Sequence, residues 1–200
     1  MISFNRTSIT GSAPITTDKF PNLCEIGDHF CSGDANIQVF DFRNLKSLRK
    51  LGDDAFSNCS ALNQIVFRTY EDEILSLSQI GSNFCASSVS LTKLDLRGVV
   101  FIDAISSGFC HSMINLVELD ISTLDRLKEI GSDFCQNCPS LTKISMPSLQ
   151  HLRYIGSHFL SDSGLKHFNL NGASCLVEIG HNFMAMSKLE TMEFKDCYAL

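Results

Sequence analysis

The 200-residue sequence contains no tryptophan, only four prolines and fewer basic than acidic side chains, with 16 Lys and Arg against 22 Asp and Glu. The resulting net charge of −6 argues against a nucleic acid as partner, because binding a polyanion requires a dense basic face. No apolar run approaches the roughly 18–20 residues of a membrane-spanning helix, so the sequence predicts no membrane insertion.

The first residues also lack the pattern of a secretory signal, which is a positively charged segment followed by an apolar stretch. Nine cysteines are present, a count that would suggest a disulfide framework in a small secreted protein. Because no signal accompanies them, we expect reduced cysteines and a cytoplasmic location. A signal sequence upstream of Met1 would instead place the protein at the cell surface.

What the sequence does contain is an internal repeat of about 25 residues. An Ile-Gly-x-x-Phe phrase recurs, as in Ile130-Gly131 followed by Phe134. Only the interval between the second and third copies is clearly longer, by about four residues. The glycine position of the seven copies is occupied by Gly27, Gly52, Gly81, Ser106, Gly131, Gly156 and Gly180.

Each copy is followed by a second phrase, Leu-x-x-Leu-x-Leu, as in Leu141, Ile144 and Met146. All seven copies are apolar at these three positions. The last four residues of the phrase alternate between outward and inward positions, which is the period of a half-buried strand. Strands that recur once per repeat and lie side by side predict a parallel sheet, which we expect to form the concave face of a curved stack.

A third phrase, Leu-x-x-Leu-x-x-Ile, leads into the next copy, as in Leu124, Leu127 and Ile130. Its spacing fits neither a regular strand nor a long helix, so we expect it to cross the back of the coil. The residue after the glycine position is Ser or Asp in six copies, as at Ser132. Because Ser and Asp cap helix N-termini, we expect a short helical turn that begins there and ends near Pro139.

Together these phrases predict an α/β solenoid, a leucine-rich-repeat superhelix with a concave parallel β-sheet and short capped helical turns, in about seven repeats of 25 residues. We expect a single domain over residues 1–200, with an irregular N-terminal segment over 1–19 and the repeats over 20–197. The longer interval is an acidic insertion after Phe67, and an insertion of this kind predicts a loop.

The phrase Leu141-Thr142-Lys143-Ile144-Ser145-Met146, with the preceding Ile130-Gly131-Ser132-Asp133-Phe134-Cys135 and with Cys138, resembles the leucine-rich repeats of the BspA-like, Treponema-type class. The resemblance covers residues 20–197. It implies the solenoid fold and a surface or interaction protein, with adhesion as the usual inference. Ordinary leucine-rich repeats place Asn or Cys three residues after the strand, but five repeats here carry Leu45, Val99, Leu124, Leu149 and Ala173.

Two features look like chemical sites, and the repeat accounts for both. Cys135-x-x-Cys138 has redox or zinc spacing, but Cys135 occupies the repeat position of Cys85 and Cys110, so we interpret it as a buried core position. The six histidines are scattered over different repeat positions, and no HExxH, GxSxG or Walker motif occurs. We therefore predict no catalytic, cofactor-binding or metal-binding residues and no enzymatic activity.

The concave face carries the candidate binding residues, because solenoids usually bind partners there. Its outward positions form columns of like charge, and we expect diagonal pairing of Asp120 with Arg97 and of Asp41 with Arg68 to relieve the repulsion. The predicted protein-binding face consists of Arg43, Arg68, Lys93, Asp95, Arg97, Asp120 and Lys143. The alternative is that these exposed side chains only keep the sheet soluble.

The sequence thus predicts a non-catalytic scaffold that binds an unidentified protein on its concave face. Two alternatives remain open, a spacer or assembly module whose ends contact another subunit and the sensor region of a longer multidomain protein. Leu189, Met192 and Phe194 would lie in a final strand with no further coil to cover them. We therefore also expect either an end-to-end contact at the C-terminal edge or a chain that continues past Leu200.

Overall fold

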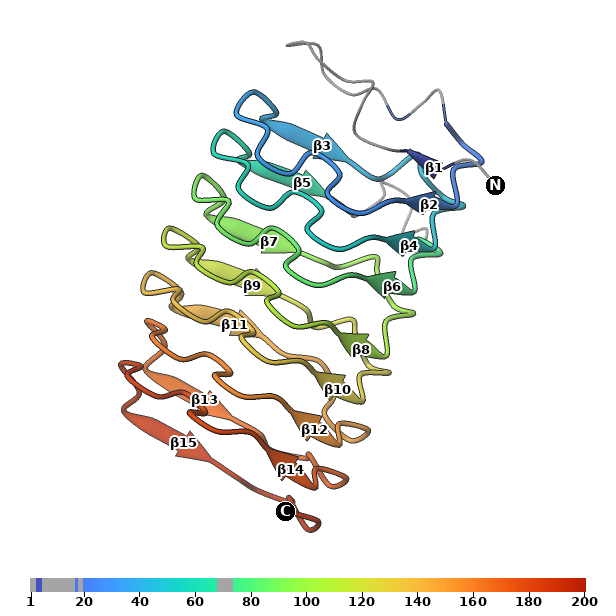
Figure 1. The fold of residues 1–200 in the computed structure, drawn as a ribbon. Coiled ribbons are helices and arrows are strands. Elements are labelled where there is room, and N and C mark those ends of the chain that lie inside the picture. Colours follow the sequence, from blue (N-terminus) through green and yellow to red (C-terminus); the bar gives the residue numbers. More distant parts are fainter. Residues whose placement is uncertain (1–2, 5–16, 18–19, 68–73) are drawn as a thin grey trace.

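In the computed structural model, which describes residues 3–4, 17, 20–67 and 74–200, the chain winds into a stack of coils (Figure 1). Two kinds of strand line two separate sides of this stack. The three-residue strands are β3 (Val39–Asp41), β5 (Gln64–Val66), β7 (Lys93–Asp95), β9 (Glu118–Asp120), β11 (Lys143–Ser145), β13 (His167–Asn169) and β15 (Thr191–Glu193). The two-residue strands are β1 (Ser3–Phe4), β2 (Glu25–Ile26), β4 (Lys50–Leu51), β6 (Gln79–Ile80), β8 (Ala104–Ile105), β10 (Glu129–Ile130), β12 (Tyr154–Ile155) and β14 (Glu178–Ile179).

The three-residue strands form from the Leu-x-x-Leu-x-Leu phrase. Their central residues point into the stack, where Leu94 and Leu119 are fully buried, whereas Lys93 and Lys143 are exposed. Where neighbouring strands are hydrogen-bonded, they pair in parallel and in repeat register, so that Glu118 lies between Lys93 and Lys143. The predicted parallel sheet and its inward and outward positions are confirmed. We call the outer surface of this sheet the long-strand face.

The Leu-x-x-Leu-x-x-Ile phrase ends in a short strand that we did not predict. Its last residue, as at Ile130, is buried, and the residue before it, Glu129, is exposed. Glu129 pairs in parallel with Ala104 on one side and with Tyr154 on the other. The back of each coil therefore carries a short strand instead of an irregular crossing, and these strands form a second parallel layer of two four-stranded sheets, β1-β2-β4-β6 and β8-β10-β12-β14.

The predicted helical turns are wrong, because no α-helix occurs in the described ranges. After the glycine position, alternate residues adopt a positive φ, as at Asp133 (60°), Cys135 (48°) and Asn137 (56°). The N–H of Asp133 donates to the carbonyl of Ser157 (2.8 Å), and that of Cys135 donates to the carbonyl of Phe109 (2.9 Å). An α-helix requires negative φ throughout and hydrogen bonds four residues back, so this segment is a ladder of turns and the fold is a β-solenoid.

The described residues accordingly include no helix long enough to cross a membrane.

The Ser or Asp after the glycine bonds an adjacent coil and caps no helix. The hydroxyl oxygen of Ser132 accepts the N–H of Ser157 at 3.2 Å, and the carboxylate of Asp53 accepts the N–H of Ser82 at 2.7 Å. The glycine is required by close packing, since a Cβ added to Gly156 would lie 2.4 Å from the backbone nitrogen of Ser132. The recurring Gly-Ser and Gly-Asp pairs thus mark where the backbones of successive coils meet.

The core between the two sheets is a column of phenylalanine rings beside buried thiols. Phe134 stacks on Phe109 and on Phe159, with ring planes 10° apart in both contacts. Cys135, which follows Phe134, and Cys138 are fully buried, which confirms the core interpretation of this pair. All nine cysteines are free thiols.

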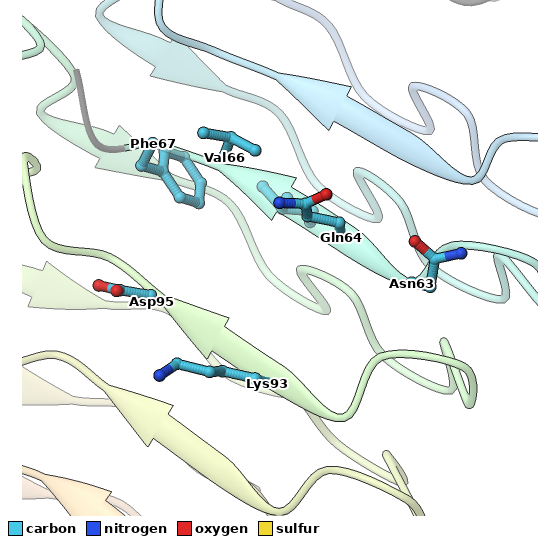
Figure 2. A pocket seen from close by; sticks show the side chains of 7 residues that line it. Asn63, Gln64, Val66, Phe67, Lys93 and Asp95 are labelled. Carbon is cyan, nitrogen blue, oxygen red and sulfur yellow. The ribbon is translucent and has the colours of Figure 1, made fainter. Parts of the chain in front are cut away.

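The long-strand sheet is interrupted at two places. Backbone hydrogen bonds join β3 to β5, join β7, β9 and β11, and join β13 to β15, but they do not join β5 to β7 or β11 to β13. The first interruption coincides with the longer repeat, whose residues 68–73 lie outside the described ranges together with most of the predicted N-terminal segment. A groove of about 300 Å³ lies there between β5 and β7 (Figure 2).

Candidate functional site

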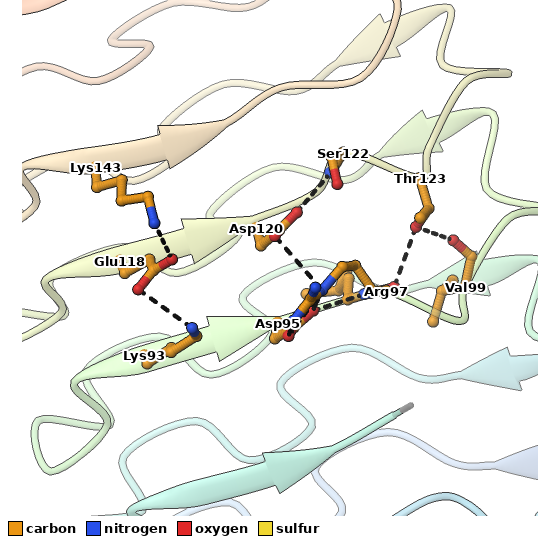
Figure 3. A network of polar contacts seen from close by, with 10 residues as sticks. Lys93, Asp95, Arg97, Val99, Glu118, Asp120, Ser122, Thr123 and Lys143 are labelled. Atoms are coloured by element: carbon orange, nitrogen blue, oxygen red, sulfur yellow. Dashed lines mark hydrogen bonds and ion pairs between the residues drawn. The ribbon is translucent and has the colours of Figure 1, made fainter. Parts of the chain in front are cut away.

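The predicted binding residues meet mainly over the middle of the long-strand face. Arg68 lies outside the described residues, and Arg43 follows β3 at one end of the sheet. The other predicted residues lie on or directly after three paired strands, β7, β9 and β11 (Figure 3). They are Lys93, Asp95, Arg97, Asp120 and Lys143.

One carboxylate bridges these three strands. Glu118 on β9 contacts the ammonium of Lys93 on β7 at 3.2 Å and that of Lys143 on β11 at 2.7 Å (Figure 3). Hydrogen bonds from Lys143 and then Lys93 lower the pKa of the Glu118 carboxyl. Glu118 was not among the predicted binding residues. The sequence could have indicated it, because a lysine occupies the same strand position one repeat before it and one repeat after it. Because the lysine side chains are 51% and 64% exposed, these ion pairs orient side chains more than they stabilise the fold.

Each of two aspartates on this face ends its strand with a hydrogen bond to the chain two residues later. The carboxylate of Asp95 accepts the backbone N–H of Arg97 at 3.0 Å, and its two oxygens accept the Arg97 Nε–H at 2.9 and 3.0 Å. Asp120 accepts the backbone N–H of Ser122 at 3.0 Å. Burial raises the pKa of Asp95, but the hydrogen bonds from Arg97 outweigh burial, so the pKa lies below its usual value.

The expected diagonal pairing is only part of the charge arrangement. Asp120 does contact Arg97 in the neighbouring coil, at 3.6 Å between Oδ2 and Nε. The other predicted pair, Asp41 with Arg68, lies partly outside the described residues. Within the described residues, Asp41 pairs with Arg43 two residues later, where the Nε–H donates to both carboxylate oxygens at 2.9 and 3.0 Å. Sequence spacing suggested pairing between coils, whereas the closest contacts of these arginines are within one coil.

The eight ion-paired side chains described over β3, β7, β9 and β11 balance one another. Each has an oppositely charged partner, and together they comprise four acids and four bases. They are Asp41, Arg43, Lys93, Asp95, Arg97, Glu118, Asp120 and Lys143. The described part of this surface thus presents oriented polar groups without a large net charge, which is not the dense basic face that a polyanion requires. Within the described ranges, no three His, Cys, Asp or Glu side chains are grouped as metal ligands.

Beside this network lies a surface feature that the sequence analysis missed. The groove between β5 and β7 is lined by Asn63, Gln64, Ile65, Val66, Phe67, Lys93 and Asp95. Its signal in the sequence was the longer repeat after Phe67, which we interpreted only as a loop. Lys93 and Asp95 belong both to the groove and to the charged network, so the two features form one continuous candidate site.

Comparisons with known proteins agree with this architecture. The chain matches the sequence profile of the BspA type leucine rich repeat region in six copies, over residues 3–112 and 78–199. A leucine-rich repeat protein from Bacteroides ovatus is similar in structure, with a TM-score of 0.50 and 19% identity over 78% of this chain and 42% of that chain. The T. pallidum leucine rich repeat protein gives a TM-score of 0.41 and 21% identity over 89% of this chain and 72% of that chain. No curated protein matches the chain.

The chain thus spans less than half the length of the Bacteroides ovatus protein. At 19% identity, that likeness supports the leucine-rich-repeat fold alone. The profile match carries more weight, because it extends over nearly the whole chain and follows the same repeats that the strands define.

Proposed function

Since the chain belongs to the family of proteins built from BspA-type leucine-rich repeats, we propose that it is a non-catalytic scaffold that binds a protein through its long-strand face. The observation that carries this proposal is the ion-paired surface over β7, β9 and β11, where Glu118 joins lysines of the two flanking strands. Solenoids present such extended sheet surfaces to their partners.

The fixed geometry of this surface supports a binding role. Side chains that are already held by neighbours lose little conformational freedom when a partner docks, which lowers the entropic cost of association. Arg97 is held by two aspartates, and both of its partners lie on paired strands of one hydrogen-bonded sheet. Because the charges are balanced, this surface contributes specificity more than electrostatic attraction.

The test replaces one ion pair on each side of the solenoid. The variant Glu118→Ala/Lys143→Ala leaves the net charge unchanged and removes the Glu118–Lys143 pair together with the contact of Glu118 with Lys93. The matched control, Asp103→Ala/Lys128→Ala, removes a pair of the same kind on the other side, where the two charged atoms lie 3.3 Å apart. We avoid reversing the charge of Arg97, because a third acid beside Asp95 and Asp120 would disturb the fold itself.

The measurement is affinity capture of proteins from an extract of the source organism, followed by binding constants for the captured protein. We expect the long-strand variant to bind at least about tenfold more weakly, which corresponds to about 1.4 kcal/mol, and the control to bind like the wild type. Equal binding by the wild type and both variants would contradict a site on this surface.

A second candidate function is assembly through the C-terminal edge. In the last described coil, Phe194 is 47% exposed and Met186 is 85% exposed, and β15 pairs on one side only, with β13. Exposed apolar side chains beside an unpaired strand edge favour contact with another coil. We expect Phe194→Lys to lower the average mass in sedimentation experiments if copies associate through this edge. A wild type that stays monomeric at high concentration would contradict this alternative.

The finer role and the location are also proposals. An adhesin-like surface or interaction module is consistent with the family, and the sensor region of a longer protein is an alternative. The free cysteines favour a reducing compartment and hence the cytoplasm, whereas an upstream signal would favour the cell surface. Immunodetection on intact and permeabilised cells of the source organism distinguishes the two locations.

A further inference from the structure

The strands β11 and β13 follow one another in the repeat order but are not hydrogen-bonded to each other. Most pairs of Cα atoms across these two strands lie more than 8 Å apart, whereas most pairs across the bonded strands β9 and β11 lie within 8 Å. Figure 1 shows the wider space between β11 and β13. Bonded strands lie about 4.8 Å apart, so these two edges are separated by more than one strand spacing, and pairing of one further strand with both edges requires about two. We call the space between the two edges the strand gap.

Two features of the sequence accompany the strand gap. The stretch from Gly156 to Leu165 is one residue shorter than the corresponding stretch from Gly131 to Leu141. After β11 the chain continues with Pro147, which has no N–H to donate. One coil earlier, the residue at this position is Ser122, whose N–H donates to Asp120 and closes the strand end. The chain thus departs from its own repeat at the place where the sheet is interrupted.

The edge of β11 that faces the strand gap has unbonded main-chain groups. One coil earlier, the C=O of Val117 accepts the N–H of Thr142 at 3.1 Å, and the N–H of Ile121 donates to the C=O of Ser145 at 2.9 Å. The equivalent groups of the β11 coil are the C=O of Thr142 and the N–H of Met146. Neither group has a partner among the described residues.

The facing edge of β13 is free in the same way. On β15, Thr191 donates its N–H back to the C=O of Lys166 at 3.1 Å, and Thr191 is in register with His167 of β13. By the same register, His167 and, two residues later, Asn169 direct their N–H and C=O groups toward β11. Two strand edges with free donors and acceptors therefore face each other, as the two neighbours of an inserted strand do.

The apolar side chains beneath the strand gap are incompletely covered. At the inward positions of the preceding coil, Leu119 and Ile121 are fully buried. The equivalent residues Ile144 and Met146 pack against the same core but are only half-buried. An inserted strand would cover them, because its inward side chains lie beside theirs. The strand gap thus combines free main-chain groups with exposed core surface.

The outward side chains beside the strand gap form a charge pattern that lacks one member. Glu118 lies between Lys93 and Lys143 on adjacent strands. Beyond the gap, the same strand position is occupied by His167, which hydrogen-bonds to Thr191 at 2.8 Å. The strands β11 and β13 themselves carry no acid. An acidic side chain on an inserted strand would lie between Lys143 and His167, as Glu118 lies between two lysines.

We propose that the strand gap binds one extended segment of a partner polypeptide as an additional strand between β11 and β13. The main chain of this segment bonds both strand edges. One acidic side chain faces outward between Lys143 and His167, and apolar side chains at alternate positions face inward and cover Ile144 and Met146. This inference rests on the proposed function and adds the position and the chemical pattern of the bound segment.

The probe is a phage-displayed library of random peptides, selected on the wild-type chain. The selected peptides are synthesised, and their dissociation constants are measured by calorimetry. Asn169→Pro removes an N–H that faces β11, and proline is tolerated on an unpaired strand edge. The matched control is Asn169→Ala, which keeps this N–H and removes only the exposed side chain. Thermal unfolding confirms that each variant is folded.

We expect the selected peptides to share an acidic residue next to apolar residues at alternate positions. Asn169→Pro should weaken their binding at least about tenfold, and Asn169→Ala should weaken it less than about threefold. Replacing the acidic residue of the peptide by glutamine should weaken binding by about threefold or more. Peptides without this pattern, equal binding by Asn169→Pro and the wild type, or a selection that returns no peptide would each overturn the proposal.

Amide hydrogen exchange tests the insertion on the wild-type chain, without any variant. The N–H groups of Met146 and Asn169 are free in the unbound protein and become bonded to the main chain of the inserted segment. A bound peptide should therefore slow their exchange at least about tenfold. A peptide that binds without slowing the exchange of either amide lies elsewhere and contradicts the proposal.

The same variants separate this inference from the proposed function. A partner that is lost from Glu118→Ala/Lys143→Ala but binds Asn169→Pro normally rejects the strand gap and leaves the ion-paired surface as the binding site. A partner that is lost only from Asn169→Pro supports the strand gap and rejects the ion-paired surface. A partner that binds both variants like the wild type rejects both proposals.

Discussion

The rings of Phe109 and Phe134 stack with their centroids 5.7 Å apart and their planes 10° apart, although one whole repeat separates them in the sequence. Phe134 stacks in the same way on Phe159, at 5.2 Å. Every ring in the middle of this column therefore covers the coils before and after it. The core of the solenoid is continuous because neighbouring coils supply the contacts that one coil cannot supply for itself.

Phe134→Ala should lower the free energy of unfolding by about 3–5 kcal/mol, because it removes a fully buried aromatic ring and leaves a cavity between two others. Chemical denaturation measures this loss. The control is Glu178→Ala, because Glu178 is an exposed residue of β14. This change should alter the free energy of unfolding by less than about 0.5 kcal/mol. Similar losses in the two variants would show that the inward and outward positions are misassigned.

Gly156→Ala should cost about 2–3 kcal/mol, because the added Cβ would lie 2.4 Å from the backbone of the preceding coil. Gly172 differs, since it has a φ of +80° and open space around it, so Gly172→Ala should cost about 1 kcal/mol through backbone conformation alone. Asparagine tolerates positive φ, so Gly172→Asn should be nearly neutral and Gly156→Asn should be as damaging as alanine. Equal recovery by asparagine at both positions would disprove the steric explanation at Gly156.

Asp95→Ala should cost about 1–2 kcal/mol, because the backbone N–H and guanidinium of Arg97 lose their acceptor. The sequence placed this residue at an exposed position of the predicted binding face, and its hydrogen bonds to Arg97 give it a structural role as well. Since the pKa of Asp95 is lowered in the folded chain, its contribution is present above about pH 4 and is lost as the pH falls through the folded value. NMR titration of the carboxyl, and denaturation at neutral and acidic pH, measure both effects. An ordinary pKa together with an unchanged stability would refute the role.

Buried thiols should make the protein less stable at alkaline pH. Burial raises the pKa of Cys110 to about 11 and also raises the pKa values of Cys85 and Cys135. Above about pH 8.5 the unfolded chain ionises these thiols while the folded chain does not, so stability should fall by up to about 1.4 kcal/mol per thiol per pH unit. Cys110→Ala should reduce the slope of stability against pH, and a slope equal to that of the wild type would argue against this cause.

The same burial determines which cysteines react in the native protein. Cys175 is exposed and should react first with a thiol reagent, whereas Cys85, Cys110 and Cys135 should react only after unfolding. Denaturation without a reductant should expose all nine thiols. A count that falls short by pairs would reveal disulfides and would contradict the reducing location.

The alternation of apolar residues and the repeat length were sufficient to predict which residues point into the stack. The period of two in each Leu-x-x-Leu-x-Leu phrase determines inward and outward positions, and the equal repeat length places Glu118 between Lys93 and Lys143 on adjacent strands. These properties are local or strictly periodic, so the sequence contains them completely. The burial of Cys135 follows from the same register.

Only the tertiary structure decided the conformation of the turns, the second sheet and the contacts of the candidate site. Ser132 resembles a helix cap in the sequence, but its hydroxyl bonds Ser157 because the backbones of adjacent coils meet at that point. Arg97 pairs chiefly with Asp95 in its own coil, and the groove opens where β5 and β7 fail to bond. The Ser132 bond and the groove depend on distances between coils, which arise only when the repeats stack. Whether Arg97 pairs with Asp95 or with Asp120 depends on side-chain distances that the repeat pattern does not contain.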